Sequence, residues 1–299
     1  MAGFSDNLRG SALMAGSMAC FTINDACMKA ALAEVPLFQA LFLRGLATTV
    51  WMLLLARALG GLKLRLPRRD RWMILIRNVT EVGAAYFFMT AILNMPLANA
   101  SAIMQALPLS VTLAGALFLG EAVGWRRLAA ILVGFAGVLM IVRPGMAGFD
   151  VYSVYPLVAV ALVTVRDLLS RKLSAEVPSV TVAFFNAFSV MAFFGVGSVF
   201  VDWAPLSGRS VLLVGAASVL IIGGYVFSVS AMRVGDLALV APFRYTSLLW
   251  ALILGLLVFE EWPAVPTLIG AAVIVATGIY TFYRERNLAR AAPKALRVR

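Results

Sequence analysis

Residues 25–36 of this chain, DACMKAALAEVP, return later as residues 167–178, DLLSRKLSAEVP, at an offset of 142 positions. Both copies end in the same four letters, AEVP, and both place a basic residue four positions after the aspartate. Chance matches among apolar residues are common in an apolar chain, but these matched positions are charged residues and a proline. We therefore interpret the two stretches as the remains of an internal duplication.

Each copy carries one acidic and one basic side chain at helical spacing: Asp25 with Lys29, and Asp167 with Arg171. Residues four positions apart meet on one face of a helix. The spacing therefore predicts an ion pair in each copy. These pairs have two possible roles, as structural links near the two membrane interfaces or as a matched pair of gates.

The duplication extends over most of each half of the chain. At an offset of 140, five residues of the first half have the same residue type in the second half. Ala91, Leu97, Ala98, Gly115 and Glu121 match Ala231, Leu237, Ala238, Gly255 and Glu261. Each unit contains five apolar segments, so the second copy should insert into a membrane upside down. Inverted repeats place a substrate site near the bilayer midplane, between the halves. We divide the chain into a first repeat at 1–146, a second at 147–284 and a basic cytoplasmic tail at 285–299.

The composition is that of an integral membrane protein. Hydrophobic residues make up 62% of the 299 residues, charged residues only 13%, and the mean hydropathy is +0.95. Soluble proteins carry about 25% charged residues, and a helical span needs roughly 20 residues. The sequence predicts an all-α fold with ten transmembrane helices. We expect them at 10–32, 36–59, 72–94, 97–119, 124–143, 152–172, 178–201, 209–232, 237–259 and 264–283.

The basic residues give the topology. If the N-terminus is inside, 18 Lys and Arg fall on the inner side or in the tail, and only Arg143 and Arg209 fall outside. Basic loops stay in the cytoplasm, so we predict both termini there, in a bacterial inner membrane. The net charge of +11 could indicate nucleic-acid binding, but its distribution between apolar segments argues against that partner. The lipid bilayer and a small-molecule substrate are the expected partners, and a monomer is sufficient.

The sequence lacks the residues that several enzymatic activities require. The chain has no histidine and only two cysteines, Cys20 and Cys27, within one apolar segment. This excludes a Ser–His triad and a cysteine-rich zinc site. There is also no phosphate-binding loop of the Walker type. We therefore expect no catalytic residue, no metal and no cofactor. An intramembrane enzyme using Asp25 and Asp167 is disfavoured, because the repeat places them near opposite membrane faces.

The order of these features resembles a known family. Pro108 lies within the fourth span, Gly120 and Glu121 close it, and Glu260 and Glu261 close the ninth. With the glycines of the fifth and tenth spans, this pattern resembles the drug/metabolite transporter superfamily, EamA type, and within it the amino-acid exporters of the YddG type. The resemblance implies two inverted five-helix halves around a central cavity lined by spans three, four, eight and nine together with one and six.

One position departs from the family pattern. By the repeat Pro108 aligns with Leu248, where the family often has a second proline, and Pro242 lies six residues earlier. The geometry of the ninth span is therefore open.

Polar side chains inside spans cost free energy unless they face a cavity or one another. The expected substrate-binding residues are Asn78, Glu81 and Tyr86 in the third span, Asn99, Ser101 and Gln105 in the fourth, Tyr225 in the eighth, and Arg244 and Tyr245 in the ninth. Glu81 and Arg244 should face one shared cavity. A carboxylate suits arginine, and an ammonium group suits glutamate or a tyrosine face, so a zwitterion fits both.

The predicted function is secondary transport that exports amino acids and related small metabolites by alternating access. The alternatives are a drug or nucleotide-sugar carrier of the same superfamily, and a membrane-embedded enzyme or scaffold.

Overall fold

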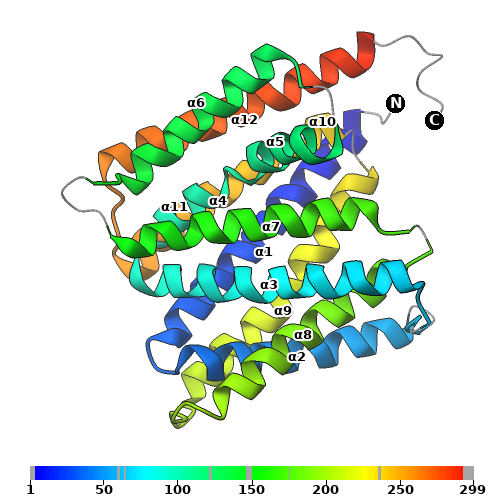
Figure 1. Ribbon diagram of the computed structural model, residues 1–299. Helices are drawn as coiled ribbons and strands as arrows, with labels where there is room; N and C mark the ends of the chain where they lie inside the picture. Colours follow the sequence, from blue (N-terminus) through cyan, green and yellow to red (C-terminus); the bar gives the residue numbers. More distant parts are fainter. Residues whose placement is uncertain are drawn as a thin grey trace.

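The computed structural model describes residues 4–58, 61–63, 65–120, 123–145, 150–174, 176–234 and 237–291 (Figure 1). In these ranges every regular element is a helix. The elements are α1 (Phe4–Leu32), α2 (Leu37–Ala58), α3 (Arg68–Asn94), α4 (Leu97–Met104), α5 (Leu107–Leu119), α6 (Trp125–Val142), η1 (Val151–Val154), α7 (Tyr155–Lys172), α8 (Ser179–Ser198), α9 (Gly208–Val234), α10 (Leu237–Val240), η2 (Ala241–Tyr245), α11 (Thr246–Phe259) and α12 (Val265–Ala291).

Eight helical segments of the described ranges are long and apolar enough to cross a membrane: Leu37–Ala58, Leu97–Leu119, Trp125–Val142, Val151–Lys172, Ser179–Ser198, Gly208–Val234, Ala241–Phe259 and Val265–Arg284. The chain is therefore a multi-pass membrane protein. α1 and α3 have 29 and 27 residues and cover the first and third expected spans, but charged and polar side chains interrupt their apolar runs. α1 begins earlier than expected and α12 ends later.

The expected fourth span is broken inside the protein. α4 ends at Met104, and α5 begins at Leu107 with Pro108 in its first turn. A proline removes one helical hydrogen bond, and its ring clashes with the carbonyl four residues earlier, which here belongs to Met104. The ninth span is broken in the same way, because Pro242 lies in the 3₁₀ segment η2. Pro242 therefore provides the second break in the absence of a proline at Leu248.

The ends of these two spans also match. Gly120 and Glu260 both adopt left-handed backbone conformations, with φ of 68° and 56°. The backbone N–H at each cap is bonded to the carbonyl of the corresponding glycine, Gly115 or Gly255. This is a common way to end a helix, and here it recurs at the 140-residue offset. Glu121 lies outside the described residues.

The helices associate in pairs that join the two halves: α1 with α9, α2 with α8, α3 with α7, and α6 with α12. Figure 1 shows α6 and α12 side by side at one edge of the bundle, away from α2 and α8. Their backbones touch, since a Cβ atom on Gly137 would lie 2.8 Å from the carbonyl oxygen of Gly270. Small residues permit such close approach in membranes. In Figure 1, α1, α3 and α7 lie between the α6–α12 pair and the α2–α8 pair.

Candidate functional site

A cavity of about 360 Å³ lies at the centre of the bundle, between α1, α3, the broken spans, α7 and α9. Five charged side chains line it: Asp25, Glu81, Arg44, Arg166 and Arg244. Aromatic and methionine side chains, with several hydroxyl and amide groups, complete the wall. Charges at this depth are costly unless they meet water, one another or a polar ligand. The cavity is thus a polar compartment within an apolar protein.

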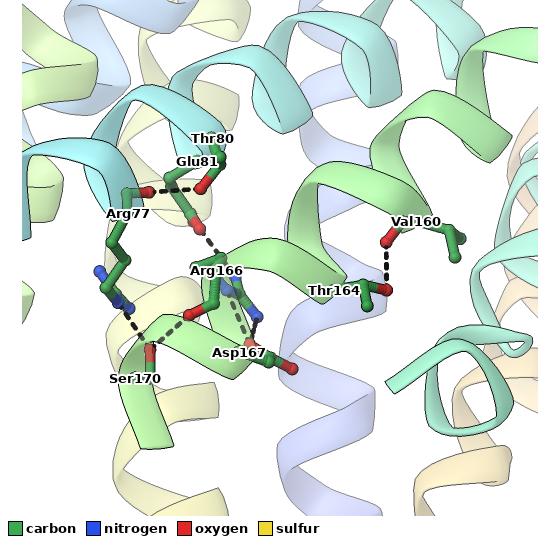
Figure 2. A network of polar contacts seen from close by, with 8 residues as sticks. All are labelled: Arg77, Thr80, Glu81, Val160, Thr164, Arg166, Asp167 and Ser170. Atoms are coloured by element: carbon green, nitrogen blue, oxygen red, sulfur yellow. Dashed lines mark hydrogen bonds and ion pairs between the residues drawn. The ribbon is translucent and has the colours of Figure 1, made fainter. Parts of the chain in front are cut away.

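Arg166 neutralises two carboxylates at the wall of this cavity (Figure 2). Its Nη1 donates to Glu81 Oε2 at 2.7 Å, and its Nε and Nη2 lie 2.9 Å from Asp167 Oδ1. Arg77 Nε donates to Ser170 Oγ at 2.9 Å, and Ser170 donates to the carbonyl oxygen of Arg166 at 2.8 Å. These bonds connect α3 to α7. We call Glu81, Arg166 and Asp167 the Arg166 cluster.

Three charged groups of the cavity are not neutralised in this way. Within the described ranges, the side chains of Asp25, Arg44 and Arg244 form no ion pair. Asp25 accepts a hydrogen bond from Asn24 at 2.9 Å and interacts with Arg44 at longer range. Arg44 is only 6% exposed, whereas the Arg244 side chain is accessible. A ligand in the cavity therefore meets two guanidinium groups and one carboxylate that keep their binding capacity.

The cavity continues into a vestibule of about 550 Å³. The two share five wall residues: Arg44, Glu81, Ala85, Ile221 and Tyr225. The vestibule reaches Leu173, Ser174 and Ser179, where α7 ends and α8 begins. The central cavity is thus approached from this end of the bundle, past Arg44 and Tyr225.

An ion pair lies beyond the opposite end of the cavity, one helical turn past Asp25. Lys29 Nζ contacts the carboxylate of Glu261 and donates to the carbonyl oxygen of Met95 at 2.9 Å. Glu261 Oε2 in turn accepts the backbone N–H of Leu97 at 2.9 Å. The Lys29 side chain is 10% exposed and that of Glu261 is 23% exposed. We call these groups the Lys29 latch, because they join the end of α1 to the α3–α4 turn and to the turn after α11.

The expected pairing of Lys29 with Asp25 within α1 is therefore wrong. Lys29 pairs with Glu261 and not with Asp25, because the turn at Glu260 brings the next carboxylate over the end of α1. In α7, Nη2 of the neighbouring Arg166 lies 2.9 Å from Asp167 Oδ1.

Several of the expected site residues do line the cavity. Glu81, Ser101, Gln105, Tyr225 and Arg244 are all in its wall. Gln105 Nε2 also donates to the hydroxyl of Ser247, which ties the break of one span to the break of the other. The expectation that Glu81 and Arg244 face one cavity is met in the structure. Their role in binding stays a prediction.

Four expected residues lie elsewhere. Asn78 and Tyr86 line a separate, largely apolar pocket of about 700 Å³ between α3 and α8. Asn78 Nδ2 there donates to the carbonyl of Phe185 and to Ser189. Asn99 is not in the wall of the cavity. The Tyr245 side chain is buried and its hydroxyl lies against Gly278 of α12. α3 has different neighbours on its faces, so residues three positions apart need not meet the same cavity.

Asn24 and Arg44 are among the cavity residues that were not expected to bind substrate. The sequence signal for both was a polar or charged side chain within an apolar span.

Comparisons with known proteins show similarity over most of the chain. The model of the EamA-like transporter family matches residues 8–143 and 153–283. The pseudopaline exporter CntI of Pseudomonas aeruginosa strain UCBPP-PA14 is 32% identical over 269 residues, 87% of this chain and 90% of that protein. A riboflavin transporter of Vibrio cholerae is 28% identical over 73% of this chain and 76% of its own length. An S-adenosylmethionine uptake transporter of Rickettsia felis is 25% identical over 64% of this chain and 65% of its own length.

One solved crystal structure superposes with a TM-score of 0.63 at 23% identity, over 93% of this chain and 98% of that chain. The fold is therefore one that is already known.

Proposed function

The chain belongs to the EamA-like transporter family of the drug/metabolite transporter superfamily, and from that premise we propose that it exports amino acids and related zwitterionic metabolites by alternating access. The family and the relatives are transporters of small metabolites and not enzymes. What remains to be assigned to this chain is the substrate, the direction of transport and the mechanism.

The substrate assignment rests on three charged groups of the central cavity, Asp25, Arg44 and Arg244, which have no ion-pair partner among the described residues. Arg44 and Arg244 can each donate two parallel hydrogen bonds to a carboxylate. Asp25 offers acceptors for an ammonium group. A ligand with a carboxylate and an ammonium group can bind the arginines and Asp25 together. An organic cation would leave the two guanidinium groups without partners. The cavity volume of about 360 Å³ suits a small metabolite.

The inverted-repeat architecture is supported by matched features in the two halves. The family model matches each half. The broken spans and their left-handed caps recur at one offset, and the main helix pairs each join one half to the other. We include α1 and α3 as the two further spans, giving ten. Their charged residues Asp25 and Glu81 face the cavity and Lys29 is paired, so lipid does not have to solvate them.

The basic asymmetry of the loops supports cytoplasmic termini and insertion into a bacterial inner membrane. With this topology the vestibule opens to the cytoplasm, and the Lys29 latch closes the outer end. Alternating access then requires the latch to open while the inner end closes. The repeat matches Lys29 with Arg171 and Glu261 with Glu121, which gives the residues of the inner gate.

A larger substrate built from amino-acid parts is a second candidate. It is favoured by the continuity of the cavity with the 550 Å³ vestibule and by the relative whose substrate is pseudopaline.

Counterflow into proteoliposomes tests the proposal. Vesicles loaded with unlabelled L-phenylalanine should accumulate radiolabelled L-phenylalanine, and a panel of competitors then ranks neutral amino acids, larger amino-acid derivatives, organic cations and nucleotide sugars. Zwitterions should compete best. Arg126→Ala is a matched control, because Arg126 is exposed and stacks on Trp125, away from the cavity. Uptake equal to that of protein-free vesicles, or inhibition by cations alone, would refute the assignment.

A further inference from the structure

Asn24 and Asp25 are adjacent residues of α1, and both line the central cavity. Asn24 Nδ2 donates to Asp25 Oδ1 at 2.9 Å. This bond fixes the orientation of the amide, because only the nitrogen can donate to a carboxylate. The Asn24 oxygen must therefore be an acceptor.

That acceptor has no partner. Asn24 is only 3% exposed, and its Oδ1 has no hydrogen bond in the described part of the chain. Buried side-chain acceptors are nearly always paired in native proteins, so an unpaired one needs a physical explanation. A donor supplied by a ligand is such an explanation, since Asn24 belongs to the wall of a cavity.

Asp25 differs from the other acids near the cavity. Glu81 and Asp167 are both neutralised by Arg166. The charged and titratable groups that face Asp25 come from the elements around the cavity: Arg44 of α2, Glu81 of α3, Arg166 of α7, Tyr225 of α9 and Arg244 of η2. Within the described ranges, none of them forms an ion pair with Asp25. Asp25 thus keeps its capacity to bind a cation.

The neighbouring acceptors match the hydrogen-bonding pattern of one kind of group. An ammonium group has three donors and no acceptor. The unpaired oxygen of Asn24 and the carboxylate of Asp25 are two neighbouring acceptors that suit such a group. Glu81, which the sequence favoured for this role, has its carboxylate already bonded to a guanidinium.

We propose that Asn24 and Asp25 form the subsite for the ammonium group of the substrate. This proposal rests on the proposed function, because it assigns the two ends of the zwitterion to different helices. The amino group binds α1, and the carboxylate binds Arg244 on η2. The substrate then spans the contact between α1 and the broken ninth span, and these elements pack directly against each other.

The test compares a substrate with an analogue in which a hydroxyl group replaces the amino group. In proteoliposomes, L-phenylalanine and L-3-phenyllactate compete with radiolabelled L-phenylalanine, and the two differ only in the group on the α-carbon, which is ammonium in the first and hydroxyl in the second. For the unmodified protein we expect phenylalanine to compete at least ten-fold better. Asp25→Asn keeps the shape and removes the charge, so the preference should fall to within about two-fold. Asn24→Leu keeps the volume and removes the acceptor, and should reduce the preference about three-fold.

Glu81→Gln is the matched control, because it should weaken both competitors to the same extent. The Asn24→Leu variant keeps the proposal testable if Asp25→Asn does not yield folded protein. A protein that transports phenylalanine but prefers it no more than phenyllactate overturns the subsite, and so does an unchanged preference in both variants. The absence of phenylalanine transport by the unmodified protein would instead overturn the proposed function.

Discussion

The Arg166 cluster and the Asn24–Asp25 pair both border the central cavity, yet their bonding differs. In the cluster each carboxylate has a guanidinium within 3 Å, at 2.7 Å for Glu81 and 2.9 Å for Asp167. In the pair, as far as the described residues go, the Asp25 carboxylate accepts a hydrogen bond only from the Asn24 amide, and the oxygen of that amide has no partner. The cluster holds α3 to α7, and the pair keeps its binding capacity for a ligand. The count of charges in a cavity is therefore less informative than their pairing.

The largest effect is expected from breaking the cluster. Arg166→Met would leave Glu81 and Asp167 without their cation. Breaking a buried ion pair costs about 3–5 kcal/mol, and access of water from the cavity should keep this loss near the lower end. We expect poor recovery of monodisperse protein and a marked fall in Tm. The triple variant Arg166→Met, Glu81→Gln, Asp167→Asn should recover much of the loss. Normal Tm in the single variant would show that the cluster does not stabilise the fold.

The next largest effect, on substrate affinity, is expected at Arg244, which has no ion-pair partner in the described ranges. Arg244→Ala should leave Tm nearly unchanged, since it breaks no ion pair there, but should weaken substrate binding. A hydrogen bond to a charged group contributes about 1.5–3 kcal/mol, which corresponds to roughly 10- to 100-fold in affinity. Competition assays in proteoliposomes measure this change, with Arg126→Ala as the control. Equal affinities in both variants would remove Arg244 from the site.

A variant of the Lys29 latch tests whether an ion pair also controls access to the central cavity from outside. Lys29→Met removes the contact with Glu261 and the bond to Met95, so the outer end should open more often. In a Cys20→Ser background, Cys27 lies half a turn before Lys29, and a membrane-impermeant thiol reagent added outside should label it several-fold faster. The charge exchange Lys29→Glu, Glu261→Lys should restore slow labelling. Unchanged labelling in Lys29→Met would mean that the latch is not a gate.

The smallest effect is expected at an exposed pair. Arg209 Nη1 lies 2.6 Å from Glu34 Oε1, and Ser207 donates to Glu34 Oε2 at 2.7 Å. The Ser207 hydroxyl and the Arg209 guanidinium lower the pKa of Glu34 below its ordinary value. The resulting stabilisation is present above the unfolded pKa and is lost as the pH falls through the lowered value. Glu34→Gln should lower Tm slightly at pH 7 and by less at pH 3, because exposed pairs contribute little. A large loss at both pH values would contradict this.

Much of the fold follows from the sequence, because apolar length and the repeat leave few alternatives. The eight membrane-crossing segments fall where apolar runs predict them. The break near Gln105 was not predicted, although Pro108 could have indicated it. The second break depends on Pro242, which is shifted from the aligned position, so the repeat alone could not locate it.

The site was predicted only in part. Glu81 and Arg244 both lie in the cavity wall, because a charged side chain within a span has few other favourable surroundings. Asn78 and Tyr86 lie in a different pocket. Helical spacing shows which residues share a face of α3, but it does not show which helix packs against that face. The partner of Lys29 lies 232 residues away in Glu261, and only the packing of α1 against the turn after α11 brings the two together.

A structure determined with bound L-phenylalanine is the most direct test of the central claim. We predict density in the central cavity, with the carboxylate within hydrogen-bonding distance of Arg244 and the amino group within reach of Asn24 and Asp25. The Arg166 cluster should keep its own bonds. Density in the apolar pocket of Asn78 and Tyr86, or a ligand in the cavity with its amino group on Glu81, would contradict the account.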